Sequence, residues 1–294
     1  MSDALKLQIR NVSKLYGNGV KALDDVSLTI SPGMFGLLGH NGAGKSTLMN
    51  SLATLQVPSA GGLRLGEVDI VAEPAEARRF IGYLPQEFGV YPGVPAIELL
   101  DYLAQLKGFD NPAKRVDEVK RLLHAVNLWD VRTRSVDTYS GGMRQRFGVA
   151  QALLGEPKLL IVDEPTAGLD PTERNRLHEI LASISRDCII FLSTHIVEDI
   201  ATLCTEMAVL HRGHIVGTGS PDDFTAQLEG RLWIGDLDTK DVAEVRAEAN
   251  VIATKVQRGK VRVLVESEAS PGAGFEPKTP TLEDTFFSLT KTHH

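Results

Sequence analysis

The sequence predicts an α/β fold built on a parallel sheet that helices cover on both faces. Apolar runs of strand length recur at residues 34–38, 80–84, 159–162 and 188–193, with helical patterns between them. Wholly apolar strands that alternate with helices are typical of parallel sheets buried on both faces. A glycine-rich loop also joins the first of these runs to a helix, which is a common connection in this class.

Two other patterns flank this sheet. Alternating apolar residues at 5–9 and 26–30 predict half-exposed antiparallel strands. The region from about 87 to 154 favours helices instead, first at 97–106. Asn111-Pro112 suits an N-cap and first turn, and apolar residues at 116, 119, 122, 123 and 126 then form one helical stripe. We interpret this region as a helical subdomain.

The pattern changes again toward the C-terminus, so we expect one domain at 1–225 and a small α+β domain at 226–294. A hairpin at 207–216 should turn at Arg212-Gly213, and a helix should start at Ser220-Pro221. Beyond it we expect a strand at 232–234, a helix at 241–249, a hairpin of 251–256 and 261–265 turning at Arg258-Gly259, a loop at 270–280 and a closing helix at 281–290.

The glycine-rich loop fits the pattern G-x-x-x-x-G-K-[ST], which binds phosphates. Glycines let backbone N–H groups turn inward, and the following helix N-terminus adds partial positive charge. Lys45 should reach the β- and γ-phosphates, and the Ser46 hydroxyl should bind Mg²⁺. The alternative is a plain turn before a helix. We assign triphosphate binding to Gly39, His40, Asn41, Gly42, Ala43, Gly44, Lys45, Ser46 and Thr47.

A carboxylate pair, Asp163 and Glu164, ends the apolar strand at 159–162. Carboxylates beside a buried strand are costly unless they hold a cation or act on water. We assign Asp163 to Mg²⁺, through a water molecule, and Glu164 to polarising the attacking water. An ordinary surface turn is the alternative interpretation of this pair.

A second anion-binding helix end is predicted at Ser140-Gly141-Gly142, which open a helix at about 143–154. The serine hydroxyl and glycine amides favour an anion, as at the phosphate loop. One nucleotide cannot use both ends of one chain if they lie far apart. A flexible turn that caps a helix is the simpler interpretation.

In this order, the motifs resemble those of the ATP-binding subunit of an ABC transporter. The resemblance covers residues 5 to about 220 with strong motifs and the remainder weakly. It implies a P-loop NTPase with a RecA-like parallel sheet, an antiparallel β subdomain and a helical insertion, and it implies ATP and Mg²⁺ as cofactors. The ending at 281–290 resembles that of exporter ATPases that serve drugs, lipids, polysaccharides or antibiotics.

The resemblance also implies further site residues. Gln86 matches the glutamine that touches Mg²⁺ and the attacking water, and His195 matches the switch histidine at the γ-phosphate. Tyr16 matches the aromatic residue that stacks on adenine. His40 stands where the family usually has Pro, in a slot that contributes mainly backbone.

The same resemblance implies a dimer. Ser140, Gly141 and Gly142 of one subunit would close on the γ-phosphate held by the other, either in a homodimer or with a paired ATPase subunit. Asp170 matches the loop along that interface. Tyr139 and Met143 depart from the family's usual Leu and Gln.

Composition limits the other partners. The 294 residues carry a net charge of −7, which gives no electrostatic reason to expect nucleic acid. Cys188 and Cys204 fit no metal or redox spacing, so we expect reduced, structural thiols. Residues 1–6 lack the apolar core of a signal peptide, and no run reaches the roughly 18–20 apolar residues of a membrane span.

We therefore expect an ATPase that lies in the cytoplasm, peripheral on the inner face of the membrane, and drives export through a separate transmembrane permease. A soluble, non-transport ABC ATPase is the alternative, although the coiled-coil insertions, zinc modules or fused cassettes of such proteins are missing from the sequence. A P-loop phosphotransferase is disfavoured by the Ser140 motif and by Gln86 and His195.

Overall fold

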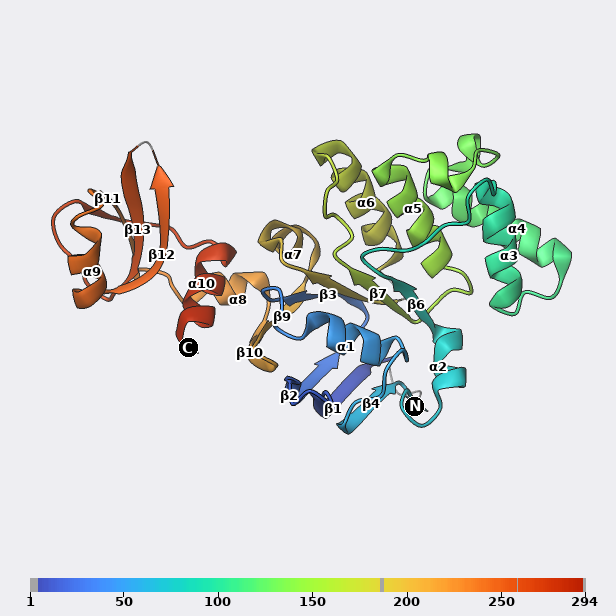
Figure 1. The fold of residues 1–294 in the computed structure, drawn as a ribbon, viewed down its shortest axis with the longest axis horizontal. Coiled ribbons are helices and arrows are strands. Elements are labelled where there is room, and N and C mark those ends of the chain that lie inside the picture. The colour runs from blue at the N-terminus through green and yellow to red at the C-terminus, as the bar shows by residue number, and fades with distance from the viewer. Residues whose placement is uncertain (1–4, 186–187, 258, 293–294) are drawn as a thin grey trace.

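The computed structural model describes residues 5–185, 188–257 and 259–292. An antiparallel sheet in the order β2-β1-β4-β5 lies at one side of the main body (Figure 1). The alternating segments predicted as antiparallel strands are β1 and β2, which pair with each other at one edge of this sheet. The strands are β1 (Leu7–Leu15), β2 (Lys21–Ile30), β4 (Ala60–Leu65) and β5 (Val68–Asp69).

The larger sheet has the order β10-β9-β3-β8-β7-β6. Its four apolar strands run parallel, as predicted, and the hairpin of β9 and β10 extends one edge. The strands are β3 (Gly33–Leu38), β6 (Ile81–Leu84), β7 (Leu159–Asp163), β8 (Ile189–Thr194), β9 (Glu206–His211) and β10 (His214–Gly219).

Each parallel strand divides its side chains between two cores. On β7, Leu159 and Ile161 pack with α1 (Lys45–Leu52) and the antiparallel sheet, whereas Leu160 and Val162 pack with the helices on the opposite face. This is the alternation that the pleat of a strand imposes. Helix α1 is therefore held between the two sheets (Figure 1). The other face is covered by α5 (Gly141–Ala152), α6 (Pro171–Ile184) and α7 (Val197–Leu203).

The helical subdomain agrees with the sequence in most details. Asn111 caps α4 by accepting from two backbone N–H groups, as predicted. The prediction that Val116 belongs to the apolar stripe is wrong, because this residue is 60% exposed. Helix α5, which follows Ser140, begins at Gly141 rather than at about 143. The remaining helices of this part are α3 (Ala96–Leu106) and α4 (Pro112–Ala125), with 3₁₀ turns at Trp129–Val131 and Val136–Thr138. Helix α2 (Pro74–Phe80) lies before it, between β5 and β6.

The C-terminal part forms its own antiparallel sheet, in the order β12-β13-β11-β14. The predicted loop at 270–280 contains β14, which pairs with β11, because an edge position accepts a short segment that carries a proline. Arg258 of the predicted turn lies outside the described residues. The elements are α8 (Pro221–Ala226), β11 (Leu232–Leu237), α9 (Val242–Glu248), β12 (Asn250–Gln257), β13 (Lys260–Glu266), β14 (Phe275–Pro277) and α10 (Leu282–Thr292).

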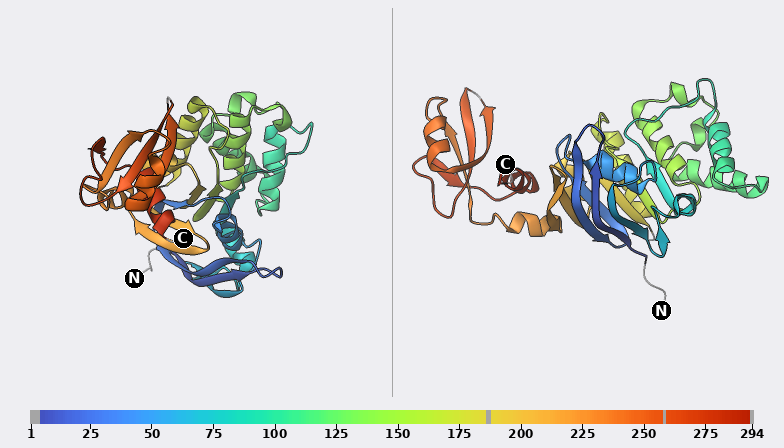
Figure 2. Two further views of the ribbon diagram at one scale, coloured as in Figure 1. Left: turned by 60° about the vertical axis from the view of Figure 1, so that its left-hand side comes forward. Right: turned by 60° about the horizontal axis from the view of Figure 1, so that its bottom comes forward.

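Helix α10 returns from this sheet to the main body. It lies between the two parts (Figure 2), and its Leu282 and Phe286 join the core on the α5–α7 face of the larger sheet. Within the described ranges, no helix is both long and apolar enough to cross a membrane.

The two cysteines are free and buried. Burial raises the pKa of Cys188 to about 11 and that of Cys204 to about 12, because an apolar environment disfavours the thiolate. Both properties agree with the predicted structural role.

Candidate active site

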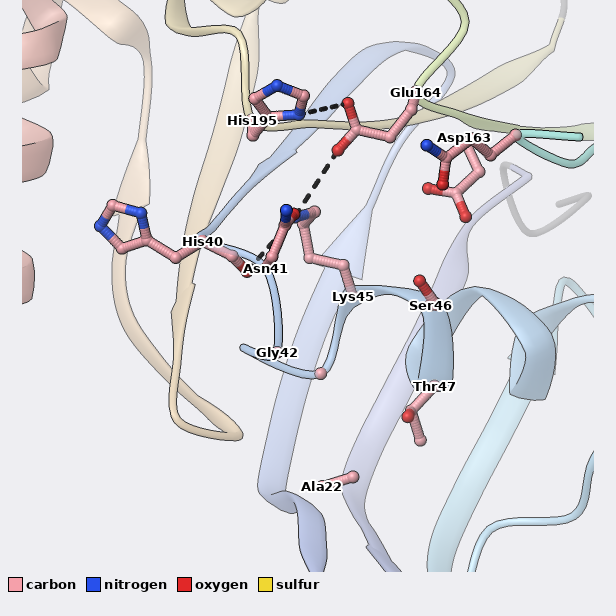
Figure 3. A pocket seen from close by; sticks show the side chains of 12 residues that line it. Ala22, His40, Asn41, Gly42, Lys45, Ser46, Thr47, Asp163, Glu164 and His195 are labelled. Atoms are coloured by element: carbon pink, nitrogen blue, oxygen red, sulfur yellow. Dashed lines mark hydrogen bonds and ion pairs between the residues drawn. The ribbon is translucent and has the colours of Figure 1, made fainter. Parts of the chain in front are cut away.

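A cavity of about 360 Å³ opens at the carboxyl ends of β3, β7 and β8 (Figure 3). Ligands of open α/β sheets bind at this edge. The cavity brings together the phosphate loop, the carboxylate pair, the predicted glutamine and the predicted switch histidine. It is lined by Ala22, His40, Asn41, Gly42, Gly44, Lys45, Ser46, Thr47, Gln86, Asp163, Glu164 and His195.

The loop backbone is shaped by its glycines. Gly42 and Gly44 have φ values of 82° and 111°, in the left-handed region that favours glycine. A Cβ on Gly44 would also lie 2.4 Å from the carbonyl oxygen of Ala22. None of the described side chains caps the N-terminus of α1. Its first N–H groups are therefore available to an anion.

Lys45 occupies the centre of the cavity. Its side chain is 6% exposed, and Nζ donates to the carbonyl oxygens of Gly39 at 2.6 Å and His40 at 3.4 Å. The Glu164 carboxylate lies 3.7 Å away. Burial lowers the pKa of Lys45, while Glu164 and Asp163 act to raise it. An ammonium held by its own loop can exchange these carbonyls for phosphate oxygens.

Glu164 is held in an unusual conformation. Its φ is +49°, which is strained for a residue with a side chain and costs about 1–3 kcal/mol. Its carboxylate lies between Lys45 and His195, whose Nδ1 is 2.6 Å from Oε2. Backbone strain of this kind is concentrated at functional sites. The geometry therefore aims one buried carboxylate into the cavity.

The oxygen atoms near Ser46 suit Mg²⁺. Ser46, Gln86 and Asp163 line the same cavity, and burial raises the pKa of Asp163. Mg²⁺ prefers oxygen ligands and is usually held by one or two carboxylates together with water and phosphate oxygens. The described residues contain no cluster of three His, Cys, Asp or Glu side chains that could hold a metal alone. The residues present therefore fit Mg²⁺ bound together with a nucleotide.

A buried carboxylate that the sequence analysis missed supports this site. Asp199, in the first turn of α7, is 0% exposed. It accepts hydrogen bonds from Thr166, which follows Glu164, and from Arg174 Nε at 2.8 Å, and its Oδ1 lies 2.9 Å from His178 Nε2. A charge this deeply buried requires such partners. The only signal in the sequence is its spacing of four residues from His195.

Some predicted residues do not line the cavity. Tyr16 is 38% exposed, and its hydroxyl lies 3.2 Å from Thr47 Oγ1 at the edge of the loop. Gly39 and Ala43 shape the loop without lining the cavity. Ala22 does line it, and the sequence analysis missed it because a small apolar residue at the start of a strand carries no chemical signal.

The second helix end is also outside this cavity. Ser140 caps α5 by accepting from the Met143 N–H at 3.3 Å, and Gly141 and Gly142 begin the helix. Asp170 caps α6 by accepting from two backbone N–H groups. Both residues have clear structural roles as helix caps. The N-terminus of α1 therefore lies in the cavity, and the N-terminus of α5 lies outside it.

Together, the sheet order, the phosphate loop and the strand-end carboxylates define a P-loop nucleoside triphosphatase. The family model described as ABC transporter matches residues 23–167. The Nod factor export ATP-binding protein I of Cupriavidus metallidurans is 34% identical over 97% of each chain. The daunorubicin/doxorubicin resistance ATP-binding protein DrrA of Streptomyces peucetius is 33% identical over 81% of this chain and 73% of the relative.

Solved structures agree with this result. The structure of an ATP-binding subunit of an ABC transporter superposes with a TM-score of 0.67 and 29% identity, and the match covers 76% of this chain and 93% of that one. The dimeric cassette MJ0796, bound to ADP and Pi, has the same fold, with a TM-score of 0.66, 24% identity, and coverage of 73% and 98%. The chain belongs to the ABC transporter ATP-binding proteins and is an ATPase.

Proposed function

We propose that this chain powers an exporter, that two copies or two paired subunits enclose ATP between them, and that their closure drives a separate transmembrane permease. The observation that carries this proposal is the division of anion-binding ends. One end, at Lys45, lies in a cavity with the Glu164–His195 pair, while the other, at Ser140, lies outside it.

Within one protomer, the side chains suit ATP hydrolysis. The loop amides and Lys45 bind the β- and γ-phosphates. Ser46 and Gln86, with Asp163 through a water molecule, would hold Mg²⁺, which would neutralise phosphate charge. Glu164 takes a proton from the attacking water on Oε1, since its Oε2 lies against His195 Nδ1. Lys45 Nζ, which lies 3.7 Å from this Oε1 atom, moves away from it when it binds the phosphate oxygens. His195 then orients the carboxylate and contacts the γ-phosphate.

Tyr16 supplies the adenine contact in this proposal. Its ring is exposed beside Thr47, at the edge of the phosphate loop, so a base can stack on it. Stacking on a base contributes about 1–3 kcal/mol in nucleic-acid complexes.

The partner subunit completes the site. Its Ser140, Gly141 and Gly142 close on the γ-phosphate, and Asp170 lies along the contact. A two-fold arrangement of this kind uses the same surface on both copies. Each ATP is then gripped by α1 of one protomer and α5 of the other.

The membrane partner and the direction of transport are inferred from the relatives. The names of the relatives from C. metallidurans and S. peucetius describe export and drug resistance. We infer that the helical subdomain docks on a permease at the inner face of the cell membrane. With a net charge of −7, the chain has no electrostatic reason to bind nucleic acid.

A mixing experiment tests the shared site. Lys45→Ala disables the cradle of a protomer but spares its Ser140 end, while Ser140→Arg does the reverse. Each variant alone should hydrolyse no ATP. In an equimolar mixture, half of the dimers are mixed and hold one intact site, so activity should return to about a quarter of the wild-type rate.

The control is a mixture in which both partners carry Lys45→Ala, one of them also with Ser140→Arg. That mixture contains no intact site and should stay inactive. If the complementary mixture is equally inactive, or if Ser140→Arg alone is fully active, the site is not shared between protomers.

A further inference from the structure

His40 lines the cavity, but its ring points away from Lys45 and contacts α10. Figure 3 shows this ring turned away from Lys45, on the side of the loop where α10 passes. Its centroid lies 4.6 Å from that of Phe286, with the ring planes 47° apart. Tilted ring pairs at this separation are attractive. A residue 246 positions further along the chain therefore contacts the phosphate loop.

The backbone of the same histidine touches the lysine of the cradle. Lys45 Nζ donates to the carbonyl oxygens of His40 and of Gly39, its neighbour in the loop. A displacement of His40 therefore moves an oxygen that positions Lys45. Burial, with a further contribution from Lys45, lowers the pKa of His40, which favours the uncharged ring beside an apolar partner.

Helix α10 is anchored on both sides of this contact. Thr285 donates to the carbonyl oxygen of Phe224 in α8 at 3.1 Å, next to the main body. Ser288 donates to Glu266 at the end of β13, in the C-terminal sheet, at 2.7 Å. Phe286 itself is only 5% exposed. The ring that contacts His40 is thus fixed by a helix that is hydrogen-bonded to the main body and to the C-terminal sheet.

We propose that Phe286 is a positioning residue for the phosphate loop, and that the C-terminal domain raises the affinity for ATP by holding His40 through it. This inference rests on the proposed function, since it requires that the Lys45 cradle binds the nucleotide. It gives the C-terminal domain a role in nucleotide binding that the motifs of the main body do not reveal.

The test is equilibrium binding of MgATP to the full chain, measured by competition with a fluorescent ATP analogue. Phe286→Leu keeps an apolar side chain on α10 and removes the ring. It should weaken MgATP binding about two- to tenfold, which is the range expected for the loss of an aromatic pair. Phe286→Tyr keeps the ring and should bind as the wild type does. Phe287→Leu is the control, because it removes from the same helix and the same core a ring that packs on Phe286, with centroids 6.2 Å apart, and leaves the Phe286 ring in place beside His40.

A double-mutant cycle separates positioning from general packing. In a His40→Ala background, Phe286→Leu should change the affinity less than twofold, since the ring it contacts is already gone. In steady-state hydrolysis, Phe286→Leu should raise KM for ATP and leave kcat unchanged. Thermal unfolding of each variant verifies that it is folded.

Three results would overturn the proposal. The first is that Phe286→Leu and Phe287→Leu change the affinity for MgATP equally. The second is that Phe286→Leu changes this affinity by the same factor with and without the His40 ring. The third is that Phe286→Leu binds MgATP more tightly than the wild type does. Lys45→Ala separates this failure from that of the proposed function. If Lys45→Ala binds MgATP as tightly as the wild type, the cradle assignment itself is wrong.

Discussion

The N-termini of α1 and α5 are built from similar residues but differ in their surroundings. Both follow a glycine or serine residue, but in the part of the chain that the structure describes the first turn of α1 has no side-chain cap, whereas at α5 the Ser140 hydroxyl accepts from the Met143 N–H. At α1, Gly44 is left-handed, and a lysine, two carboxylates and a histidine surround the helix end. At α5, Ser140 has an ordinary extended backbone and caps its own helix.

The comparison shows that a helix N-terminus with glycine and serine residues is not by itself a complete triphosphate site. The α1 end has Lys45 and the proposed base, Glu164, within one protomer. The α5 end offers a hydroxyl and amides only, so it can add contacts to a phosphate held elsewhere but cannot hold a triphosphate alone.

The largest effect is expected for Glu164→Gln, because we propose that this carboxylate, at the α1 end, is the base for hydrolysis. The amide keeps the shape but cannot accept the proton of the attacking water. Hydrolysis should fall about 10²–10⁴-fold while MgATP binding persists. Single-turnover hydrolysis and equilibrium binding measure the two quantities. Wild-type turnover by this variant would show that the base lies elsewhere.

Nucleotide binding should separate the two ends next. Lys45→Ala removes charge-assisted bonds to phosphate and should weaken MgATP binding by an isolated protomer at least about tenfold. Ser140→Arg should leave that affinity within about twofold, since in our proposal the Ser140 end acts on the partner's nucleotide. Titration at concentrations where the protein is monomeric distinguishes them. Equal losses would mean that both ends hold the same nucleotide.

Folding stability should also differ. Gly44→Ala places a Cβ against the Ala22 carbonyl oxygen and forces a side chain into a left-handed backbone, so it should cost about 1–3 kcal/mol of unfolding free energy. Gly89→Ala is the control, because Gly89 has open space around it and a backbone that is not left-handed. Urea unfolding measures both, and a cost for Gly44→Ala no larger than that of Gly89→Ala would contradict the strain argument.

The smallest effect is expected for Ser140→Ala. This change removes the cap of α5 and should cost about 1 kcal/mol in the same urea experiment. Ser140→Asp is a useful comparison, since it can cap the helix equally well but repels a phosphate. We expect it to restore stability without restoring hydrolysis. Recovery of hydrolysis by Ser140→Asp would show that capping is the only role of this residue.

Much of the main body could be predicted from local pattern. Wholly apolar strands, the Asn111 cap and the glycine-rich loop are each specified by residues close together in the sequence. Val116 was misplaced because a helical stripe predicts which residues share a face but not how wide the buried contact is. The short strand β14 was missed because its pairing depends on β11, far away in the sequence.

The site shows the same limit. Motif spacing identified most of the residues that line the cavity, although their roles stay predictions. Ala22 and Asp199 carry no motif, and only folding brings Ala22 to the cavity and Asp199 into contact with Thr166. The contact of Phe286 with His40 depends on the return of α10 to the main body, which no local pattern encodes.

The hydrogen bonds of Asp199 have a mechanical consequence. One carboxylate ties the turn after β7 to the helix that follows β8, through Thr166 on one side and its own position four residues after His195 on the other. The loop after β7 and the loop after β8 are thus mechanically coupled, so that a displacement of one is transmitted to the other.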